Sequence, residues 1–549
     1  MKSIKELFQN VEYEILQGSD ETPVTDVSCD SRKIHEGSAF FCFIGAAMDG
    51  HKFAVNAIKA GASVLVIQRD IDEELSEGIQ NAGTLESRNK NEKLDGTDKG
   101  KAEAFSEMLK KVTIIKTSDT RYALALAAAE ISDHPARKML TIAITGTKGK
   151  TSITSMIQKI LTNAGHKVGT IGTVGADCGG EFIKTETTTP ESTDVEAFFQ
   201  KMVDNGCDVC VMEVSSQALM LHRVSGIMFD YGLFTNLSPD HIGGAEHKDM
   251  DDYIHCKSLL FRQCRHGHFN LDDEHFPAMV ENCTCDITTY SCRKQKASEH
   301  EKPLKESREG KESGSILKAD LLAENIRYVR EAGFLGMEFE TTGSVNESFR
   351  VSAPGEFSVY NALAAISVCH MAGVPVPVIQ KSLMEIHVRG RMEPVKISPR
   401  FTLLIDYAHN AVAMESILKA MRKYEPKRIV SLFGCGGNRS RIRRFEMGEI
   451  SGLYADFSIL TEDNSRLEDV NDIIQDIVTG ISKTDGEYVI IPDRKEAIRY
   501  SIENAREGDI ILLLGKGHED YQDKNGKKTP FDERVIIREI LEEINWKYE

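Results

Sequence analysis

The fold class is decided by the stretch Leu140-Thr141-Ile142-Ala143-Ile144-Thr145-Gly146-Thr147-Lys148-Gly149-Lys150-Thr151-Ser152. Its first five residues are mostly apolar and predict a buried strand, and a helical pattern follows over residues 152–164. The two are joined by a turn that contains two glycines. Strand, glycine turn and helix in this order favour an α/β protein with a nucleotide-binding domain.

The glycine turn carries the chemistry expected of a phosphate-binding loop. Its glycines let backbone N–H groups approach a phosphate, Lys150 supplies a positive charge, and Thr151 offers a hydroxyl to Mg²⁺. The standard P-loop needs glycine at position 144, where this chain has Ile144, so the loop has the shortened G-x-x-G-K-T form. A glycine turn without a ligand is the alternative, which the flanking strand and helix disfavour. We predict that ATP binds to Gly146, Thr147, Lys148, Gly149, Lys150, Thr151 and Ser152.

Length and composition restrict the class of protein. At 549 residues the chain exceeds one ordinary core, and about 100 to 200 residues per domain predicts three domains, or four. A hydrophobic content of 41% with 28% charged residues is typical of a soluble globular protein. The formal net charge of -18 argues against a nucleic-acid partner, because such binding depends on Lys and Arg neutralising phosphates.

The sequence shows no sign of a membrane span, export or disulfides. No apolar run reaches the roughly 18 residues of a span, and the start, Met1 to Phe8, enters a helical pattern directly. We therefore expect a cytoplasmic monomer that acts on small molecules. The 12 cysteines are scattered, and the C-x-x-C pair Cys207 and Cys210 has no matching second pair. Reduced, buried thiols are favoured over disulfides or zinc.

Alternating strand and helix patterns divide the chain into three sections. Residues 40–44 and 63–67 predict short strands, with a helix around 53–59 between them. Two charged stretches, 69–111 and 293–315, are predicted to be an inserted or mobile loop and a solvated loop. The other predicted elements are a helix at 361–372 and strands at 401–405, 428–433, 457–461, 488–491 and 510–514. Boundaries near 139 and 396 give the domains 1–139, 140–395 and 396–549.

Polar residues follow two later strands of the central section. Glu213 ends one apolar strand, and Asp240 and His241 follow another. Oxygen ligands and an imidazole at strand ends suit Mg²⁺ beside a phosphate. A single Glu or His in such a place is more often structural, but two of them after one phosphate loop favour a site.

The ATP loop and six later motifs, in order, resemble the Mur ligase family, whose loop reads G-T-x-G-K-T. The motifs are Tyr360-Asn361-Ala362-Leu363-Ala364-Ala365, Gly390-Arg391-Met392-Glu393, Asp406-Tyr407-Ala408-His409, Phe433-Gly434-Cys435-Gly436-Gly437-Asn438-Arg439, Asp463-Asn464-Ser465-Arg466 and Gly515-Lys516-Gly517-His518-Glu519-Asp520-Tyr521-Gln522. The resemblance covers nearly the whole chain apart from the two charged stretches. It implies a UDP-binding domain, a central P-loop domain with a parallel sheet, and a Rossmann-like carboxyl-terminal domain that closes over ATP.

The resemblance also implies an activity. The enzymes it points to use ATP to add the third amino acid to UDP-MurNAc-L-Ala-D-Glu, a precursor of peptidoglycan, through an acyl phosphate. Lys257 matches a lysine that the family carries as a carbamate, which would bind a second Mg²⁺; a surface lysine is the plain alternative. The catalytic residues implied are Lys150, Glu213, His241 and Lys257, and the Mg²⁺ ligands are Thr151, Glu213, His241 and carbamylated Lys257.

The remaining site residues implied by the resemblance fall into three groups. Further residues near ATP are Asn361, Arg391, Asp406 and His409. Those that would contact the UDP-muramoyl-peptide are Ser31, Ala46, Ala47, Thr188, Thr189, Ser215 and Arg223. Those that would line the amino-acid site are Arg439, Asp463, Asn464, Ser465, Arg466, Gly515 and Glu519. An arginine with two carboxylates suits an amino acid that carries a second ammonium and carboxylate.

Several positions depart from the family pattern. Where the family has D-N-P-R for meso-diaminopimelate, this chain has Ser465 in place of proline and keeps Arg466, which favours diaminopimelate over L-lysine. Gln217 stands where histidine is common, and Asn410-Ala411 replaces Thr-Pro. The stretch 241–257 also looks longer than in similar enzymes. These changes leave the ATP chemistry intact and place the acceptor in question.

Three alternatives remain open at this point. One is a paralogue of the third-residue enzymes that acts on another carboxylate. A second is a ligase similar to folylpolyglutamate synthetase, which would not explain Asp30-Ser31-Arg32 or the motif at 515–519. The third is a non-catalytic nucleotide-binding protein, which the joint presence of Lys150, Glu213, His241 and Lys257 disfavours.

Overall fold

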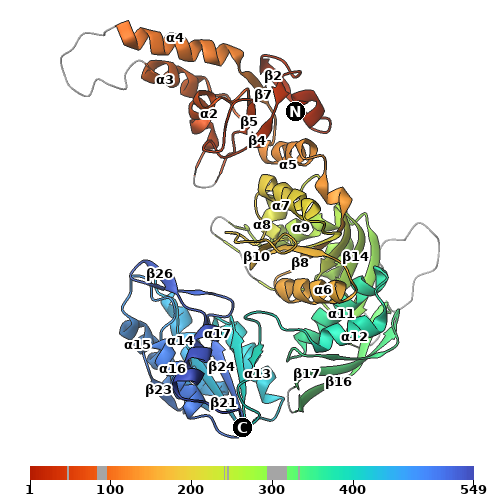
Figure 1. Ribbon diagram of the computed structural model, residues 1–549, viewed down its shortest axis with the longest axis vertical. Helices are drawn as coiled ribbons and strands as arrows, with labels where there is room; N and C mark the ends of the chain where they lie inside the picture. Colours follow the sequence, from red (N-terminus) through yellow and green to blue (C-terminus); the bar gives the residue numbers. More distant parts are fainter. Residues whose placement is uncertain are drawn as a thin grey trace, which may run out of the picture. The chain divides into compact units, whose positions relative to one another are not determined.

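A computed structural model describes residues 1–45, 48–82, 96–239, 242–243, 246–293, 318–331 and 334–548 of the chain (Figure 1). The chain divides into two compact units. The first contains residues 1–150, 165–269 and 273–288, and the second contains residues 151–164, 270–272 and 289–549. Among the described residues, no helix combines the length and the hydrophobicity needed to cross a membrane. The α/β fold class predicted from the sequence is confirmed.

The amino-terminal part of the first unit is built on a five-stranded sheet in the order β2-β7-β6-β5-β4. Only β2 pairs antiparallel, and the other neighbours are parallel. Apolar side chains of β5 and β6 are buried because both faces of the sheet are covered. The elements are β1 (Lys2–Ser3), α1 (Ile4–Leu7), β2 (Glu14–Gln17), β3 (Pro23–Val24), β4 (Asp26–Ser28), β5 (Ser38–Phe41), η1 (Gly50–Phe53), α2 (Ala54–Ala60), β6 (Val64–Ile67), β7 (Thr113–Lys116), α5 (Thr120–Ile131) and η2 (Pro135–Lys138).

The first charged stretch is helical in its described part, so the prediction of a mobile loop was wrong there, and the prediction of an insertion stays a prediction. It forms α3 (Asp72–Ala82) and α4 (Gly96–Lys111). Each helix places a few apolar side chains on one face: Phe105 is 3% exposed, and Leu75 and Leu109 pack against the same core. A narrow apolar stripe is sufficient to dock a helix, although its average composition is polar. Residues 83–95 and most of the second charged stretch, 294–317, lie outside the described residues.

The nucleotide-binding part of the first unit places β8 (Leu140–Thr145) between β12 (Val209–Glu213) and β13 (Phe229–Phe234), both parallel to it. Ile144 pairs with Glu213, and Thr145 pairs with Phe234, so the three strands end at the same edge. The strands lie in the order β11-β10-β9-β12-β8-β13-β14. The other elements are β9 (Val168–Gly172), β10 (Gly175–Asp177), β11 (Phe182–Ile183), α7 (Ser192–Asp204), α8 (Ser216–Met220), α9 (Met250–Ser258), η3 (Leu259–Arg262), β14 (Cys264–Asn270) and α10 (Phe276–Val280).

The second unit begins with α6 (Lys150–Asn163) and an antiparallel β-meander of β16 (Leu321–Glu331), β17 (Phe334–Gly343) and β18 (Ser348–Val351). The end of β15 (Asp286–Ser291) pairs parallel with β16. Helix α11 (Phe357–Met371) is almost entirely buried, whereas α12 (Val376–Met384) is amphipathic. Asn163 of α6 donates a hydrogen bond to Ser382 of α12, which ties α6 to this unit.

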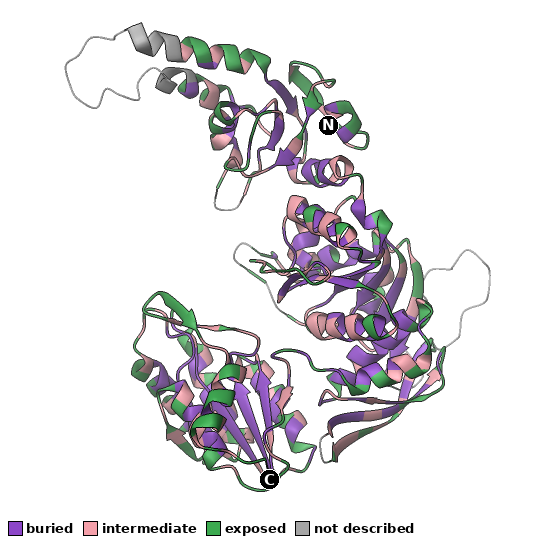
Figure 2. Ribbon diagram, in the orientation of Figure 1, coloured by how far each residue is buried: buried purple, intermediate pink, exposed green. Residues whose placement is uncertain are grey.

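The carboxyl-terminal part of the second unit is a six-stranded sheet in the order β19-β20-β24-β21-β22-β23. All its neighbours are parallel except β19. Figure 2 shows the strands buried and the outer faces of the helices exposed, as expected for a sheet covered on both faces. The elements are β19 (Glu393–Val395), β20 (Thr402–Asp406), α13 (Ala411–Arg422), β21 (Arg428–Phe433), α14 (Arg441–Tyr454), β22 (Phe457–Leu460), α15 (Val470–Ile481), β23 (Tyr488–Ile490), α16 (Arg494–Glu503), β24 (Asp509–Leu514), β25 (Tyr521–Lys524), β26 (Lys527–Pro530) and α17 (Glu533–Glu543).

The strands predicted at 401–405, 428–433, 457–461, 488–491 and 510–514 are present as β20 to β24, with ends that differ by one residue at most. All 12 cysteines are free thiols, and Cys207 and Cys210 are buried. Eight of the 12 cysteines are buried, and Cys29, Cys283, Cys285 and Cys292 are half-buried. That all of them are reduced stays a prediction.

Candidate active site

The phosphate loop after β8 is shaped by the residues that follow β13. Asn236 accepts a hydrogen bond from Thr147 N–H at its carbonyl (2.8 Å) and from Lys148 N–H at its side chain (3.0 Å). The Thr235 hydroxyl donates to the Lys148 carbonyl at 2.7 Å. Gly146 has φ +147°, and a Cβ there would lie 1.9 Å from the Thr235 hydroxyl oxygen. Only glycine fits this position, which explains the first glycine of the motif.

Lys150 lies over this loop. Its ammonium donates to the Gly146 carbonyl at 2.7 Å and to the Thr147 carbonyl at 3.2 Å. The lysine therefore places its charge on the same loop whose N–H groups face a phosphate in related loops. Thr151 follows it in the first turn of α6.

Glu213 is held at the end of β12 by a group of threonines. The carboxylate is 1% exposed and accepts from the Thr173 N–H at 3.1 Å and the Thr173 hydroxyl at 3.0 Å. Thr188 contacts that hydroxyl at 3.1 Å. Thr189 donates to the Glu213 carbonyl at 2.9 Å and accepts from the Ser215 N–H at 3.1 Å. Glu213, predicted as a catalytic residue and Mg²⁺ ligand, thus shares one network with Thr188, Thr189 and Ser215, which were predicted for the UDP-muramoyl-peptide.

Lys257 is a buried cation and not a surface lysine. On α9 its side chain is 2% exposed, and its ammonium donates to the Gly146 carbonyl at 3.1 Å. It also lies 4.6 Å from the ring centroid of Tyr253, whose hydroxyl is 3.1 Å from the Thr147 hydroxyl. Lys257 and the phosphate loop are therefore brought together. His241 lies outside the described residues.

The residues predicted for the UDP-muramoyl-peptide are described in part. Ser31 is half-buried after β4, whereas Ala46 and Ala47 lie outside the described residues. Arg223 donates to Glu191 at 2.7 Å and to the Thr189 carbonyl at 3.0 Å, and Ser215 caps α8 through the Ala218 N–H.

Six of the seven residues predicted for the amino-acid site, all but Ser465, line one pocket of the second unit, of about 280 Å³. It lies beyond the carboxyl ends of β20, β24, β21 and β22, the usual ligand edge of a parallel sheet. The loops close on each other because Gly437 donates its N–H to the Asn464 carbonyl at 2.8 Å. A Cβ on Gly437 would lie 1.9 Å from the Ser465 carbonyl oxygen. The lining residues are Tyr407, His409, Gly434, Cys435, Gly436, Arg439, Arg443, Asp463, Asn464, Arg466, Gly515 and Glu519.

The charges around this pocket are of both signs. Arg439 and Arg443 form no ion pair or side-chain hydrogen bond with the described residues. Arg466 donates to the Gly437 carbonyl at 2.5 Å, from a backbone at φ +53°. Asp463 and Glu519 supply carboxylates. The pocket therefore offers donors for carboxylates and acceptors for ammonium groups.

Lys516 supports this pocket and was missed in the sequence. It is fully buried and donates to Asn464 Oδ1 at 2.8 Å, to the Tyr521 carbonyl at 2.6 Å and to Glu519 at 3.3 Å. Asp463 lies 3.6 Å away. The sequence signal for this role was the position of Lys516 inside the Gly-Lys-Gly-His-Glu motif. A lysine between glycines, however, usually predicts an exposed side chain.

The residues predicted near ATP in this unit are Asn361, Arg391, Asp406 and His409. Asn361 is buried in α11. Asp406 accepts from the N–H groups of Met392 and Ala408, both at 2.7 Å, and burial raises its pKa while Arg391 opposes the shift. His409 lines the amino-acid pocket.

Two residues that line this pocket, Tyr407 and His409, form a group of tilted rings with His518. The ring centroids of His409 and His518 each lie 4.7 Å from that of Tyr407, at interplanar angles of 56° and 48°. Burial lowers the pKa of His518 to about 4, and the neighbouring arginines 391, 389 and 534 act in the same direction. His518 is therefore neutral at pH 7.

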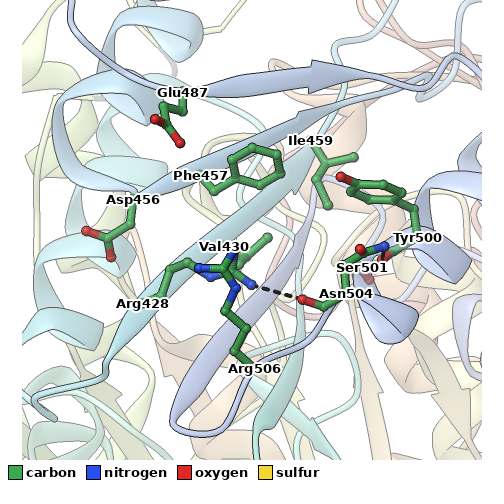
Figure 3. Close-up of a pocket in the computed structure, with 10 residues that line it drawn as sticks. All are labelled: Arg428, Val430, Asp456, Phe457, Ile459, Glu487, Tyr500, Ser501, Asn504 and Arg506. Carbon is green, nitrogen blue, oxygen red and sulfur yellow. Dashed lines mark hydrogen bonds between the residues drawn. The ribbon is translucent and has the colours of Figure 1, made fainter.

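A second pocket, of about 240 Å³, lies at the amino ends of β21 and β22 (Figure 3). Two arginines line it. Arg428 is neutralised by Asp509 at 2.6 Å and donates to the Asn504 carbonyl at 3.1 Å, whereas Arg506 is exposed and forms no ion pair with the described residues. Val430 and Ile459 form its apolar floor, beside Tyr500.

Three sequence families match consecutive parts of the chain. The Mur ligase family, catalytic domain, matches residues 23–129; the Mur ligase middle domain matches 144–369; and the Mur ligase, glutamate ligase domain, matches 390–517.

Curated relatives match the chain over almost its full length. UDP-N-acetylmuramoyl-L-alanyl-D-glutamate--2,6-diaminopimelate ligase of Caldanaerobacter subterraneus subsp. tengcongensis is 37% identical over 540 residues, covering 98% of each chain. The ligase of the same name from Clostridium tetani is 35% identical over 544 residues, covering 98% of this chain and 99% of the relative.

Solved structures show the same fold. A UDP-N-acetylmuramoyl-L-alanyl-D-glutamate--2,6-diaminopimelate ligase covers 100% of both chains with a TM-score of 0.66 at 24% identity. Folylpolyglutamate synthase of Mycobacterium tuberculosis covers 72% of this chain and 92% of that one, with a TM-score of 0.53 at 14% identity. By its three consecutive family matches and its full-length relatives, the chain belongs to the Mur ligase family.

Proposed function

We propose that the chain is an ATP-dependent ligase that adds meso-diaminopimelate to UDP-MurNAc-L-Ala-D-Glu in the synthesis of peptidoglycan precursors. The proposal rests on the pocket in the second unit, whose lining side chains carry both positive and negative charges. Arg439, Arg443 and Arg466 offer donors for two carboxylates, and Asp463 and Glu519 offer acceptors for two ammonium groups. The full-length relatives named for this reaction support the same assignment.

The choice of meso-diaminopimelate as the amino acid depends on Arg466 and its loop. L-Lysine lacks the distal carboxylate that meso-diaminopimelate carries, and Arg466 offers a planar guanidinium to that group. Asp463 to Arg466 keep the loop order of the diaminopimelate enzymes, with Ser465 in place of proline. The loop here is fixed by Gly437 and Lys516 without proline, because Asn464 bonds to both.

The reaction needs activation of a carboxylate. A carboxylate oxygen of the D-Glu residue attacks the γ-phosphorus of ATP and ADP leaves, which gives an acyl phosphate. The amino group of the amino acid then attacks the acyl carbon, loses a proton, and inorganic phosphate departs. Lys150 and the N–H groups of the loop would bear the phosphate charge, so positioning and neutralisation would supply most of the catalysis.

Mg²⁺ would be held by hard oxygen ligands. Thr151 and Glu213 supply a hydroxyl and a carboxylate, and a carbamate on Lys257 would add two further oxygens, which suits this ion. Addition of CO₂ would also convert the buried Lys257 cation into an anion. Bound in this way, Mg²⁺ would neutralise phosphate oxygens. His241 completes the set proposed from the family.

We infer that the three domains of the family bind different substrates. Residues 1–139 would hold UDP through Ser31, Ala46 and Ala47, and residues 140–395 would bind ATP and the muramoyl-peptide through Thr188, Thr189, Ser215 and Arg223. Residues 396–549 would bind the amino acid, with Arg391, Asp406 and His409 near ATP. We place this monomer in the cytoplasm, where UDP-linked precursors and ATP occur together.

An amino-acid panel tests the proposal. UDP-MurNAc-L-Ala-D-Glu, ATP and Mg²⁺ are supplied with meso-diaminopimelate, L-lysine, L-glutamate or no amino acid, and phosphate release and product mass are measured. We expect release and a tripeptide product with diaminopimelate. No product with any amino acid would contradict the proposal, and product with L-lysine alone would contradict the choice of substrate.

A Lys150→Ala variant tests the use of the loop. Loss of a charge that neutralises the phosphates should lower kcat by about 100-fold or more. Lys201→Ala, which removes a half-buried lysine of α7 paired with Glu181, is the matched control and should keep wild-type activity.

A further inference from the structure

Three potential metal ligands gather at α9, outside the residues that the reaction uses. They are His247, Asp252 and Cys256. Asp252 and Cys256 are one helical turn apart and therefore share a face of α9. His247 precedes the helix by three residues, and its ring is 1% exposed. Cys256 is buried, and Asp252 is half-buried at the open side of the cluster.

The ligand atoms are spaced as a metal site requires. His247 Nδ1 lies 3.0 Å from Asp252 Oδ2, and Cys256 Sγ lies 3.9 Å from Asp252 Oδ1. All three ligand atoms lie within 4.8 Å of one another. Tetrahedral zinc bonds of about 2.0 to 2.3 Å separate neighbouring ligands by roughly 3.3 to 3.8 Å. Shifts of about 1 Å or less would therefore seat an ion.

Nε2, the ring nitrogen of His247 that would not bind the metal, already has a hydrogen-bond partner, as the free nitrogen of a metal-bound histidine does. Nε2 lies 2.8 Å from Oγ of Ser216, a buried residue at the start of α8. Metal-ligating histidines almost always use the other ring nitrogen in such a bond, which fixes the ring. The backbone is fixed too, because Gly243 N–H donates to the His247 carbonyl at 2.8 Å.

The cluster differs from the proposed magnesium site in position and in chemistry. Lys257 and Tyr253 occupy the neighbouring face of α9, one position along from Cys256 and Asp252. Nitrogen, oxygen and sulfur together suit zinc, whereas magnesium takes oxygen ligands in octahedral geometry. The scattered cysteines gave no metal-binding spacing in the sequence, because these ligands come from a loop and one helical turn.

We propose that His247 Nδ1, an Asp252 carboxylate oxygen and Cys256 Sγ bind one Zn²⁺, with water at the fourth position. The ion ties His247 to α9, the helix that carries Lys257. Binding releases the Cys256 thiol proton to water. The proton on His247 Nδ1, which faces Asp252 in the free protein, moves to Nε2, where the ring donates it to Ser216 Oγ. Ser216 acts as a positioning residue through His247.

Metal titration of the full-length, metal-stripped protein tests the site without ATP or muramoyl-peptide, so its outcome is independent of the proposed reaction. We expect one Co²⁺ per chain with a thiolate-to-cobalt charge-transfer band, displaced by one equivalent of Zn²⁺ and unaffected by millimolar Mg²⁺. The wild-type spectrum needs no variant and reports sulfur coordination directly. Absence of that band, or displacement of the metal by Mg²⁺, would overturn the proposal.

Four variants assign the ligands. Cys256→Ser should abolish the charge-transfer band, and His247→Gln should weaken Zn²⁺ binding by about 100-fold or more. Ser216→Ala should weaken it by about 10- to 100-fold, the usual effect of losing an outer partner. Cys283→Ser removes a half-buried thiol elsewhere and should leave binding unchanged. Equal Zn²⁺ affinity in wild type and Cys256→Ser would show that the three side chains form only a hydrogen-bonded chain, and would refute the site.

Discussion

The two ends of the carboxyl-terminal sheet carry pockets of similar size and opposite character. At the carboxyl ends of the strands, arginines 439 and 443 face a pocket of about 280 Å³ without a charged partner among the described residues. At the amino ends, Arg428 lines a pocket of about 240 Å³ and is paired with the buried Asp509. Arg439 and Arg443 are therefore available to a ligand, whereas Arg428 stabilises the fold through its ion pair.

The difference has a cause in the topology. Parallel strands deliver their following loops to one edge, so four loops far apart in the chain meet there and can be shaped independently. At the other edge the strands begin, and Arg428, the first residue of β21, is neutralised by Asp509, the first residue of β24. We therefore expect Arg428 to stabilise the fold and Arg439 to bind a ligand, and variants of both residues test this distinction.

The largest effect is expected from Lys516→Met. This removes a buried cation and leaves Asp463 and Glu519 without their shared partner. Loss of one member of a buried charge cluster destabilises a protein by about 3–5 kcal/mol. Urea unfolding of the variant measures this change, and an unfolding free energy within about 1 kcal/mol of wild type would contradict the role assigned to Lys516.

Arg428→Ala should destabilise the fold and spare binding. The guanidinium bonds to Asp509 and to the Asn504 carbonyl, and loss of charge-assisted bonds to a buried carboxylate costs about 2–3 kcal/mol. Urea unfolding should show this loss, while the KM for the amino acid stays at the wild-type value. A raised KM with unchanged stability would reverse the contrast between the two pockets.

Arg439→Ala should weaken binding of the amino acid and leave the stability of the fold almost unchanged. Its side chain is exposed and makes no ion pair with any described residue, so the unfolding free energy should change by less than about 0.5 kcal/mol. Loss of a charge-assisted contact should raise the KM for the amino acid by about 10- to 100-fold. Arg506→Ala, at the amino-end pocket, is the matched control, and an equal rise in both variants would reject the assignment.

The smallest effect concerns pH. Because the pKa of His518 falls from its ordinary value near 6.5 to about 4 in the folded chain, the unfolded chain binds the proton more tightly. His518 therefore costs no stability above about pH 6.5, and stability is lost as pH falls from there to about 4. Between pH 7 and pH 5, the midpoint of urea unfolding should fall less for His518→Asn than for wild type. An equal fall of the midpoint in the two proteins would contradict the lowered pKa of His518.

The phosphate loop and most strands were predictable because their signals are local. Residues 140–152 contain the strand, the turn and the start of the helix in one continuous stretch, and Gly146 is required by a contact with Thr235, the residue that follows β13. The strand patterns of the last section placed β20 to β24 to within one residue. Local patterns thus identified both the loop and the sheet that supports the pocket.

Other features depend on contacts that no local pattern contains. Helices α3 and α4 dock through Leu75, Phe105 and Leu109 in a stretch that is otherwise polar. The burial of Lys516 depends on Asn464, in the loop after β22, and on Tyr521, the first residue of β25. The family resemblance named the pocket residues, but their partners, and therefore which cations remain available, required the folded chain.

The most direct test of the account compares two amino acids in two proteins. The account assigns selection of the distal carboxylate to Arg466 in the pocket at the carboxyl ends of the strands. Steady-state kcat/KM is measured for meso-diaminopimelate and L-lysine with wild type and with Arg466→Ala. We expect wild type to prefer diaminopimelate, and the variant to lose most of that preference, by about 10- to 100-fold. An unchanged preference in Arg466→Ala would contradict the account.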